Sequence, residues 1–170
     1  MSRFAWFLPL LALFLYTGAA GAKPPPASGF VGSDACRDCH AAEYENWRGS
    51  HHDLAMQAPG PDTVLGNFDD AEFTYNAVTS RFYRDGDRYM VRTDGEDGKL
   101  SDYEVSYVFG VYPLQQYLLP LSRGRLQALS VAWDSRPAAE GGQRWFHLYP
   151  DEAVDHEDPL HWTGPYQNWN

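Results

Sequence analysis

The stretch TSRFYRDGDRYMVRT, residues 79–93, carries the strongest fold signal in this sequence of 170 residues. Residues 79–84 and 87–93 are rich in aromatic and β-branched side chains, and they flank Asp85-Gly86, a pair that favours a two-residue β-hairpin turn. The stretch therefore predicts an antiparallel hairpin. We expect the surrounding segment, residues 72–149, to form antiparallel β-structure.

More strands are predicted after the hairpin. Residues 94–98 are rich in Asp and Gly and indicate a second turn. Apolar and mostly polar side chains alternate along residues 102–109, which is the period of a half-buried strand. Residues 125–133 and 144–149 indicate two further strands, joined by a loop that is rich in Pro and Gly.

Two segments of the C-terminal half are predicted to be less regular. Residues 111–121 are apolar but contain Pro113 and Pro120, so we expect an edge strand or irregular structure there. Residues 150–170 begin with an acidic stretch and end in an aromatic one, and they are predicted to form a loop tail.

The segment on the N-terminal side of the sheet, residues 33–57, is predicted to be helical. Ser33 or Asp34 can cap a first helix, and Gly49 can end it. Ser50 can then cap a second short helix that runs through Met56.

This helical segment contains Cys36-Arg37-Asp38-Cys39-His40, which holds both cysteines of the chain. C-x-x-C-H is the attachment pattern of c-type haem. In that pattern two thiols bind the two vinyl groups of one porphyrin, and the adjacent histidine reaches the iron. We therefore predict thioether bonds from Cys36 and Cys39 to haem c, with His40 as the proximal iron ligand. The predicted fold class is α+β, with short N-terminal haem-binding helices packed beside an antiparallel β-sheet.

Three other chemistries are possible for a Cys-x-x-Cys pair. A structural zinc site needs four ligands and commonly a second Cys/His pair, and the chain has no second cysteine pair. A thioredoxin-like dithiol follows a strand of a βα unit, and no strand is predicted before Cys36. A disulfide between Cys36 and Cys39 on a short helix would be strained. Haem attachment is the preferred interpretation.

The distal iron ligand is expected soon after the motif. His51, His52 and Met56 are the candidates, and His52 is preferred. A histidine ligand would lower the redox potential relative to methionine. The chain must turn around the haem edge to bring any of them into place, and Gly49-Ser50 is where it can turn. Two aromatic residues on the haem face of the first helix are expected to pack on the porphyrin, Tyr44 and Trp47.

The N-terminus is typical of an exported protein. Arg3 provides a short basic region, residues 4–16 form an apolar run, and residues 20–22 form a small-x-small cleavage site. We predict a signal peptide over residues 1–22, with an uncleaved anchor as the alternative. The expected location is therefore periplasmic or secreted, with no membrane span after cleavage.

The remainder of the chain is predicted to form one domain. Residues 23–29 form a Pro-rich tether, and residues 30–170 form a cytochrome c-like domain made of a haem-binding segment (33–57), a β-rich segment (72–149) and the loop tail (150–170). The formal net charge is −10. This acidity disfavours nucleic acid and anionic membranes and suits a basic redox partner. The aromatic end of the chain suggests a fragment of a longer protein.

Several motifs resemble a known family. Trp47, Ser50, His52 and Ala55 follow the haem motif with the spacing W-x-x-S-x-H-x-x-A, which resembles multihaem c-type cytochromes. Four later segments resemble larger exported members of that family, which are often fused to tetratricopeptide repeats. The segments are YVFG, PLQQY, AWD and WFHLYP (residues 107–110, 113–117, 132–134 and 145–150).

The resemblance implies roles for several histidines. It makes His52 an axial ligand, either of its own haem or of a neighbouring one. His161, and less so His147 and His156, could be ligands of further haems in a longer chain; the alternative is that they are ordinary core or surface residues. The expected partners are redox proteins and further haem modules.

These patterns predict an electron-transfer protein that binds haem c. Two alternatives remain open: a haem redox enzyme, or part of one, acting on small nitrogen or sulfur oxides, and a non-redox, β-rich interaction module. The sequence favours the electron carrier over an enzyme acting on its own.

Overall fold

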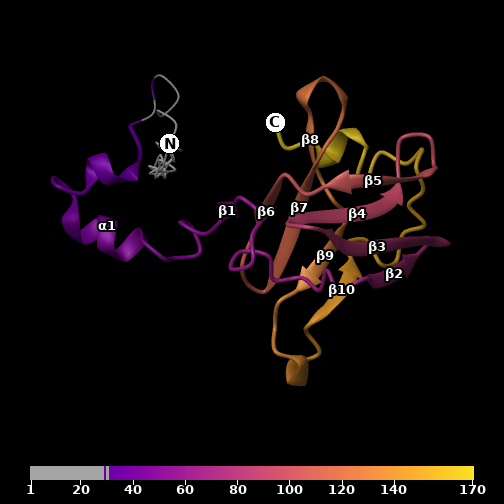
Figure 1. The fold of residues 1–170 in the computed structure, drawn as a ribbon, viewed down its shortest axis with the longest axis horizontal. Helices are drawn as coiled ribbons and strands as arrows, with labels where there is room; N and C mark the ends of the chain where they lie inside the picture. The colour runs from indigo at the N-terminus through magenta and orange to yellow at the C-terminus, as the bar shows by residue number, and fades with distance from the viewer. Residues whose placement is uncertain (1–28, 30) are drawn as a thin grey trace, which may run out of the picture.

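The computed structural model describes residue 29 and residues 31–170 (Figure 1). The predicted signal peptide and nearly all of the Pro-rich tether lie outside the described residues. No helix within the described residues has the length and apolar character needed to cross a membrane.

The predicted hairpin forms part of a four-stranded antiparallel sheet. Its strands follow one another in chain order: β2 (Ala71–Tyr75), β3 (Val78–Asp85), β4 (Arg88–Asp94) and β5 (Leu100–Glu104). Asp85 pairs with Arg88, so the turn residues are Gly86-Asp87 rather than Asp85-Gly86. Gly86 has a φ of 60°, a conformation that glycine adopts without a steric penalty. The hairpin is confirmed, and its turn lies one residue further along.

The second sheet has six strands. Its order is β1-β6-β7-β9-β10, and β8 also pairs with β7. The strands are β1 (Met56–Gln57), β6 (Tyr107–Phe109), β7 (Leu114–Pro120), β8 (Leu126–Ala128), β9 (Val131–Asp134) and β10 (Arg144–His147). The prediction of an edge or irregular segment over 111–121 was wrong, because β7 lies at the centre of this sheet. Pro113 precedes the strand and Pro120 ends it, so neither proline interrupts the middle of the hydrogen-bond ladder.

The predicted strand over residues 102–109 is divided between the two sheets. The N–H of Val105 donates to the carbonyl of Tyr89 on β4, and the N–H of Ser106 donates to the carbonyl of Leu118 on β7. The buried face also changes at this switch: Val105 and Val108 are buried, whereas Tyr107 is exposed, so the alternation expected of a single strand does not continue into β6.

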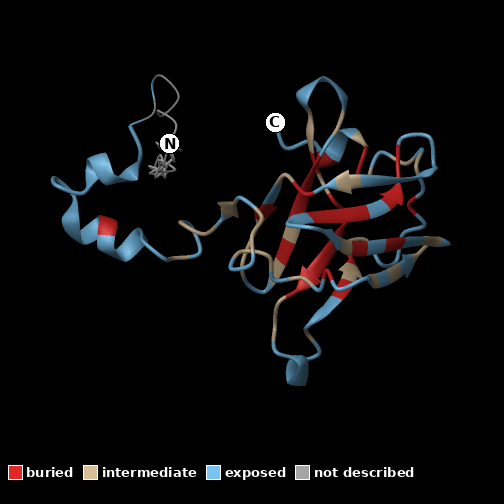
Figure 2. Ribbon diagram, in the orientation of Figure 1, coloured by how far each residue is buried: buried red, intermediate tan, exposed pale blue. Residues whose placement is uncertain are grey.

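An aromatic cluster joins the two sheets and forms the centre of the core. The buried residues lie mainly in the strands of the two sheets (Figure 2). Phe68, which lies just before β2, is its hub. The Phe68 ring packs edge-on against Phe82 and Tyr89 of the four-stranded sheet and against Tyr117 and Trp145 of the six-stranded sheet, with ring centroids 5.2–5.8 Å apart. Each sheet thus buries its apolar face against the other.

The predicted α+β fold class, with haem-binding helices packed beside the sheet, was wrong: the described residues form mainly antiparallel β-sheet. The described helices are short: α1 (Ala41–Trp47) and the 3-10 helices η1 (Ser33–Cys36), η2 (Ser122–Gly124), η3 (Ala138–Glu140) and η4 (Pro165–Gln167). The η1–α1 segment projects away from the β region, and the main contacts of α1 are with η1 (Figure 1). Only Tyr44 of α1 is buried, so this helix has no apolar stripe wide enough to cover a sheet.

The second helix predicted through Met56 does not form. The chain makes a turn over residues 51–54, and Met56 then enters β1, where it pairs with Phe109. Backbone pairing with β6 replaces the helical hydrogen bonds that the local sequence favoured.

Gly66 provides a test of how tightly the core is packed. Its N–H donates to the Tyr117 hydroxyl at 3.1 Å, and a Cβ atom at this position would clash with that hydroxyl and lie 2.8 Å from Cη2 of Trp145. We expect Gly66→Ala to lower the free energy of unfolding by about 1–3 kcal/mol in urea denaturation. Gly60→Ala is the matched control, because its Cβ would meet only Thr63 Oγ1, at an ordinary 3.7 Å. Equal stability of the two variants would contradict this packing.

Candidate functional site

The Cys-x-x-Cys-His motif folds as one helical turn between η1 and α1. Cys36 ends η1, and His40 is the residue that precedes α1. The N–H of His40 donates to the carbonyl of Cys36 at 2.9 Å, which closes the turn. Both cysteines are exposed and free. Neither Ser33 nor Asp34 caps η1, because its N-cap is Gly32 and no side chain bonds to that end.

An apolar hollow of about 240 Å³ lies against this turn. Four of its six lining residues are predicted site residues: Cys36, His40, Tyr44 and Trp47, the others being Ser33 and Glu43. The rings of Tyr44 and Trp47 are neighbours, with centroids 6.1 Å apart. The structure therefore brings one thiol, the imidazole and the two aromatic side chains to a common surface.

A hydrogen bond fastens the two sides of this hollow together. The Tyr44 hydroxyl donates to Asp34 Oδ1 at 2.5 Å, which ties α1 to η1. This bond to a carboxylate is the main reason that the pKa of Tyr44 lies above its ordinary value. Asp34 was expected only as a helix cap. The two residues are ten positions apart, and no periodic pattern in the sequence links them.

The predicted distal ligands lie outside the hollow. Gly49, with a φ of 71°, follows the end of α1, and the chain turns there as expected. The N–H of Asp53 donates to Ser50 Oγ at 3.4 Å, and Asp53 Oδ2 accepts the Gly49 N–H at 2.8 Å. This reciprocal cap holds the turn that carries His51 and His52, both exposed. Neither of these histidines nor Met56 lines the hollow.

The donor set at the motif fits a covalently attached haem. The thiols of Cys36 and Cys39 are free to react, and within the described residues no hydrogen bond involves the His40 imidazole. The hollow beside them is apolar, as a porphyrin face requires. Residues that could hold the group are therefore Cys36, Cys39 and His40. No cluster of three or more His, Cys, Asp or Glu side chains suited to a metal ion occurs in the described part of the chain.

His161 lies in the interior of the β region instead. Its Nδ1 is 2.8 Å from Thr163 Oγ1, and its Nε2 is 3.2 Å from Asp94 Oδ2, an ion-pair contact that is not aligned as a hydrogen bond. Burial alone would raise the pKa of Asp94, but the contacts with His161 and with the Thr93 hydroxyl together lower it below its ordinary value. This is the environment of a core residue, which is the alternative interpretation of His161. His147 is also buried.

Comparison with known families supports the interpretation of the motif. Residues 35–67 match the family described as "Cytochrome c554 and c-prime". The match supports a cytochrome c family. It includes the haem motif, α1 and the turn that carries His52, and it ends before β2. Comparison with curated proteins and with solved structures gave no match.

The match to this cytochrome c family suggests haem c binding and electron transfer. It does not extend to the later segments that resemble larger multihaem members, so that finer resemblance stays a prediction.

Proposed function

We propose that this chain binds one haem c covalently through Cys36 and Cys39, with His40 as an iron ligand, and transfers electrons in the periplasm or outside the cell. The observation that carries the proposal is the C-x-x-C-H turn itself. Its thiols are free, and its histidine and first cysteine line an apolar hollow.

Attachment needs no oxidant or reductant. Each thiol adds across one vinyl group: a sulfur–carbon bond forms, and the thiol hydrogen goes to the other vinyl carbon. When bound, haem c supplies a one-electron iron couple. Tyr44 and Trp47 would bury part of the porphyrin face, and the bond from Tyr44 to Asp34 would keep the hollow in shape.

Exposed acidic residues surround the site and support a basic redox partner. They are Asp34, Asp38, Glu43 and Glu45, against the nearby basic residues Arg37 and Arg48. A partner with complementary charge would be attracted at low ionic strength. Further haem modules of a longer chain are proposed as additional partners.

The distal ligand remains part of the proposal. Because His52 does not line the hollow beside His40, it is better suited to a neighbouring haem than to its own. His51 and Met56 are the alternatives. The same observation favours the second candidate function, because a haem without a distal ligand can bind and reduce small nitrogen or sulfur oxides.

Two measurements test these proposals in a host that attaches haem to exported proteins. Haem staining after denaturing electrophoresis, together with the intact mass, should show one haem per chain. A colourless protein would contradict haem binding and favour the β-rich interaction module. The ferrous spectrum then separates the two haem functions: insensitivity to carbon monoxide supports the carrier, and a shift on adding the gas supports the enzyme.

A further inference from the structure

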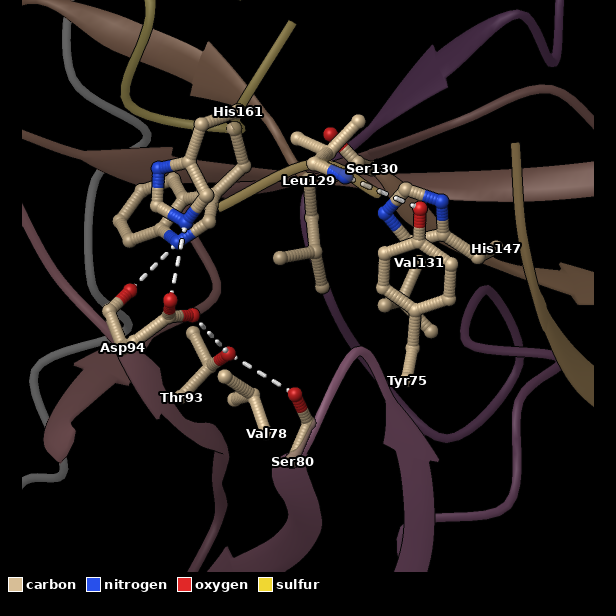
Figure 3. A pocket seen from close by; sticks show the side chains of 12 residues that line it. Tyr75, Val78, Ser80, Thr93, Asp94, Leu129, Ser130, Val131, His147 and His161 are labelled. Carbon is tan, nitrogen blue, oxygen red and sulfur yellow. Dashed lines mark hydrogen bonds and ion pairs between the residues drawn. The ribbon is translucent and has the colours of Figure 1, made fainter. Parts of the chain in front are cut away.

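A small, partly open pocket lies between the two sheets, far in sequence from the haem motif (Figure 3). Its volume is about 30 Å³, roughly the space of one water molecule. Polar side chains from both sheets and from the C-terminal segment line it, among them Tyr75, Ser80, Asp94, Ser130, His147 and His161. Buried titratable side chains of the two sheets therefore lie next to the C-terminal segment that follows β10, which contains no strand.

His147 is neutral and forms a hydrogen bond with the backbone at the beginning of that segment. Its Nδ1 accepts a hydrogen bond from the backbone N–H of Tyr149 at 3.1 Å, so this nitrogen carries no proton and Nε2 does. The His147 ring stacks on Tyr75, with centroids 3.6 Å apart. The side chain is only 7% exposed.

Tyr75 extends this attachment to the next residues. Its hydroxyl contacts the carbonyl of Tyr149 at 3.0 Å and the carbonyl of Glu152, and it accepts a long hydrogen bond of 3.4 Å from the N–H of Val154. The pair formed by His147 and Tyr75 therefore contacts the chain at Tyr149, Glu152 and Val154.

A second attachment follows at the far side of the pocket. Trp162, in the core and 2% exposed, donates from Nε1 to the carbonyl of Asp94 at 2.7 Å, next to the contact between Asp94 and His161. Residues 149–158 lie between these two attachments, and we name them the C-terminal strap. Within the strap, Asn76 Nδ2 also donates to the carbonyl of Val154 at 2.9 Å. The strap has five acidic residues and no Lys or Arg: Asp151, Glu152, Asp155, Glu157 and Asp158.

We propose that the C-terminal strap is a pH-sensitive device, released from the β region when His147 takes up a proton, while Trp162 and the two sheets stay in place. A proton added at Nδ1 removes the acceptor of the Tyr149 N–H and turns two N–H groups toward each other. The hydrogen bond that starts the strap is then lost, and an imidazolium is left almost fully buried.

The groups that face His147 act on its charged form in both directions: the Tyr149 backbone and Asp94 favour that form, His161 disfavours it, and the effect of burial is larger than any of these. The facing groups are Tyr75 from β2, Tyr149 beside it, and His161 and Asp94 across the pocket. Asp94 is already in contact with His161. Burial lowers the pKa of His147 below its ordinary value.

The direction of the pH effect follows from this lowered pKa. In the open state His147 has the ordinary histidine pKa of about 6.5, and in the closed state its pKa is lower. Between these two pH values the closed state therefore binds fewer protons than the open state. Closure is therefore fully favourable above about pH 6.5 and is weakened as the pH falls through that window. One proton taken up on opening changes the opening equilibrium by up to about tenfold per pH unit.

Hydrogen exchange on the full chain tests the proposal. Protection of peptides covering the strap, corrected for the intrinsic effect of pH, should fall by up to about fivefold between about pH 6.5 and pH 5.5. Peptides from β3 and β4 should keep their protection. Unchanged protection of the strap, or equal loss in the strands, would overturn the proposal.

Two variants separate His147 from other titrating groups. His147→Asn keeps an acceptor oxygen for the Tyr149 N–H but does not titrate, so its strap should show no dependence on pH. His156→Asn is the matched control, because His156 lies within the strap beside Gly98, and this variant should keep the wild-type response. A pH response that persists in His147→Asn would overturn the proposal.

A spectroscopic measurement on the unaltered chain does not depend on a variant that folds. The ¹⁵N shifts of His147 should show the Nε2–H tautomer at neutral pH, and its protonation should coincide with loss of strap protection. Protonation of His147 while the strap stays protected would overturn the proposal.

Discussion

Replacing both Cys36 and Cys39 by serine is expected to abolish covalent haem attachment and to leave the stability of the β region unchanged. The first effect is complete, because no other cysteine exists in the chain to form a thioether bond. The second follows from the fold: η1 and α1 contact mainly each other and project from the sheets (Figure 1). Haem content per mole of protein and urea unfolding of the β region measure the two effects.

A matched control for the double variant is Ser33→Ala, since Ser33 lines the same hollow and carries no thiol. It should retain haem at the wild-type level. In both proteins we expect the free energy of unfolding of the β region to stay within about 0.5 kcal/mol of the wild type. A larger loss in the double variant would mean that the haem-bearing segment packs on the sheets, contrary to this structure.

Replacing Phe68 by alanine is expected to lower the free energy of unfolding by about 3–5 kcal/mol. Phe68 is 4% exposed, and its ring meets four other aromatic rings from both sheets. The variant loses the transfer free energy of the ring and leaves a cavity whose rigid aromatic walls cannot collapse. Urea denaturation followed by tryptophan fluorescence measures the loss, since Trp145 belongs to the same cluster.

Leu65→Ala is the control for the core variant. Leu65 lies three residues before Phe68 and is 40% exposed, so its truncation should cost well under half as much. Phe68→Ala protein that remains folded should also carry one haem per chain, because the attachment turn lies outside the core. A loss below about 1.5 kcal/mol would show that Phe68 is not the hub of the cluster.

The local features of this protein were largely predictable. The β3–β4 hairpin follows from alternating side chains and a glycine at the turn, and the structure confirms it with a shift of one residue. The turn after α1 at Gly49 was also expected, and it forms. Signals of this kind depend only on residues close together in the sequence, so they predict local structure whatever the tertiary contacts are.

Predictions that depended on distant partners were wrong or incomplete. Pro113 and Pro120 indicated an edge strand, yet β7 is central because the prolines lie outside its paired interior. Nothing local in residues 105–106 shows that their N–H groups donate to different sheets. The helical zone was expected to pack on the sheet, but only Tyr44 of α1 has a buried side chain.

The candidate site shows the same division. The sequence alone determined which atoms can react, because the chemistry of two thiols and an imidazole at C-x-x-C-H spacing depends only on residues 36–40. The tertiary structure alone decided that Asp34 holds Tyr44, that His161 is enclosed with Asp94 in the core, and that the haem-bearing turn stands apart from the sheets. The physical reason is that covalent spacing is set along the chain, whereas burial and hydrogen-bond partners depend on segments that only folding brings together.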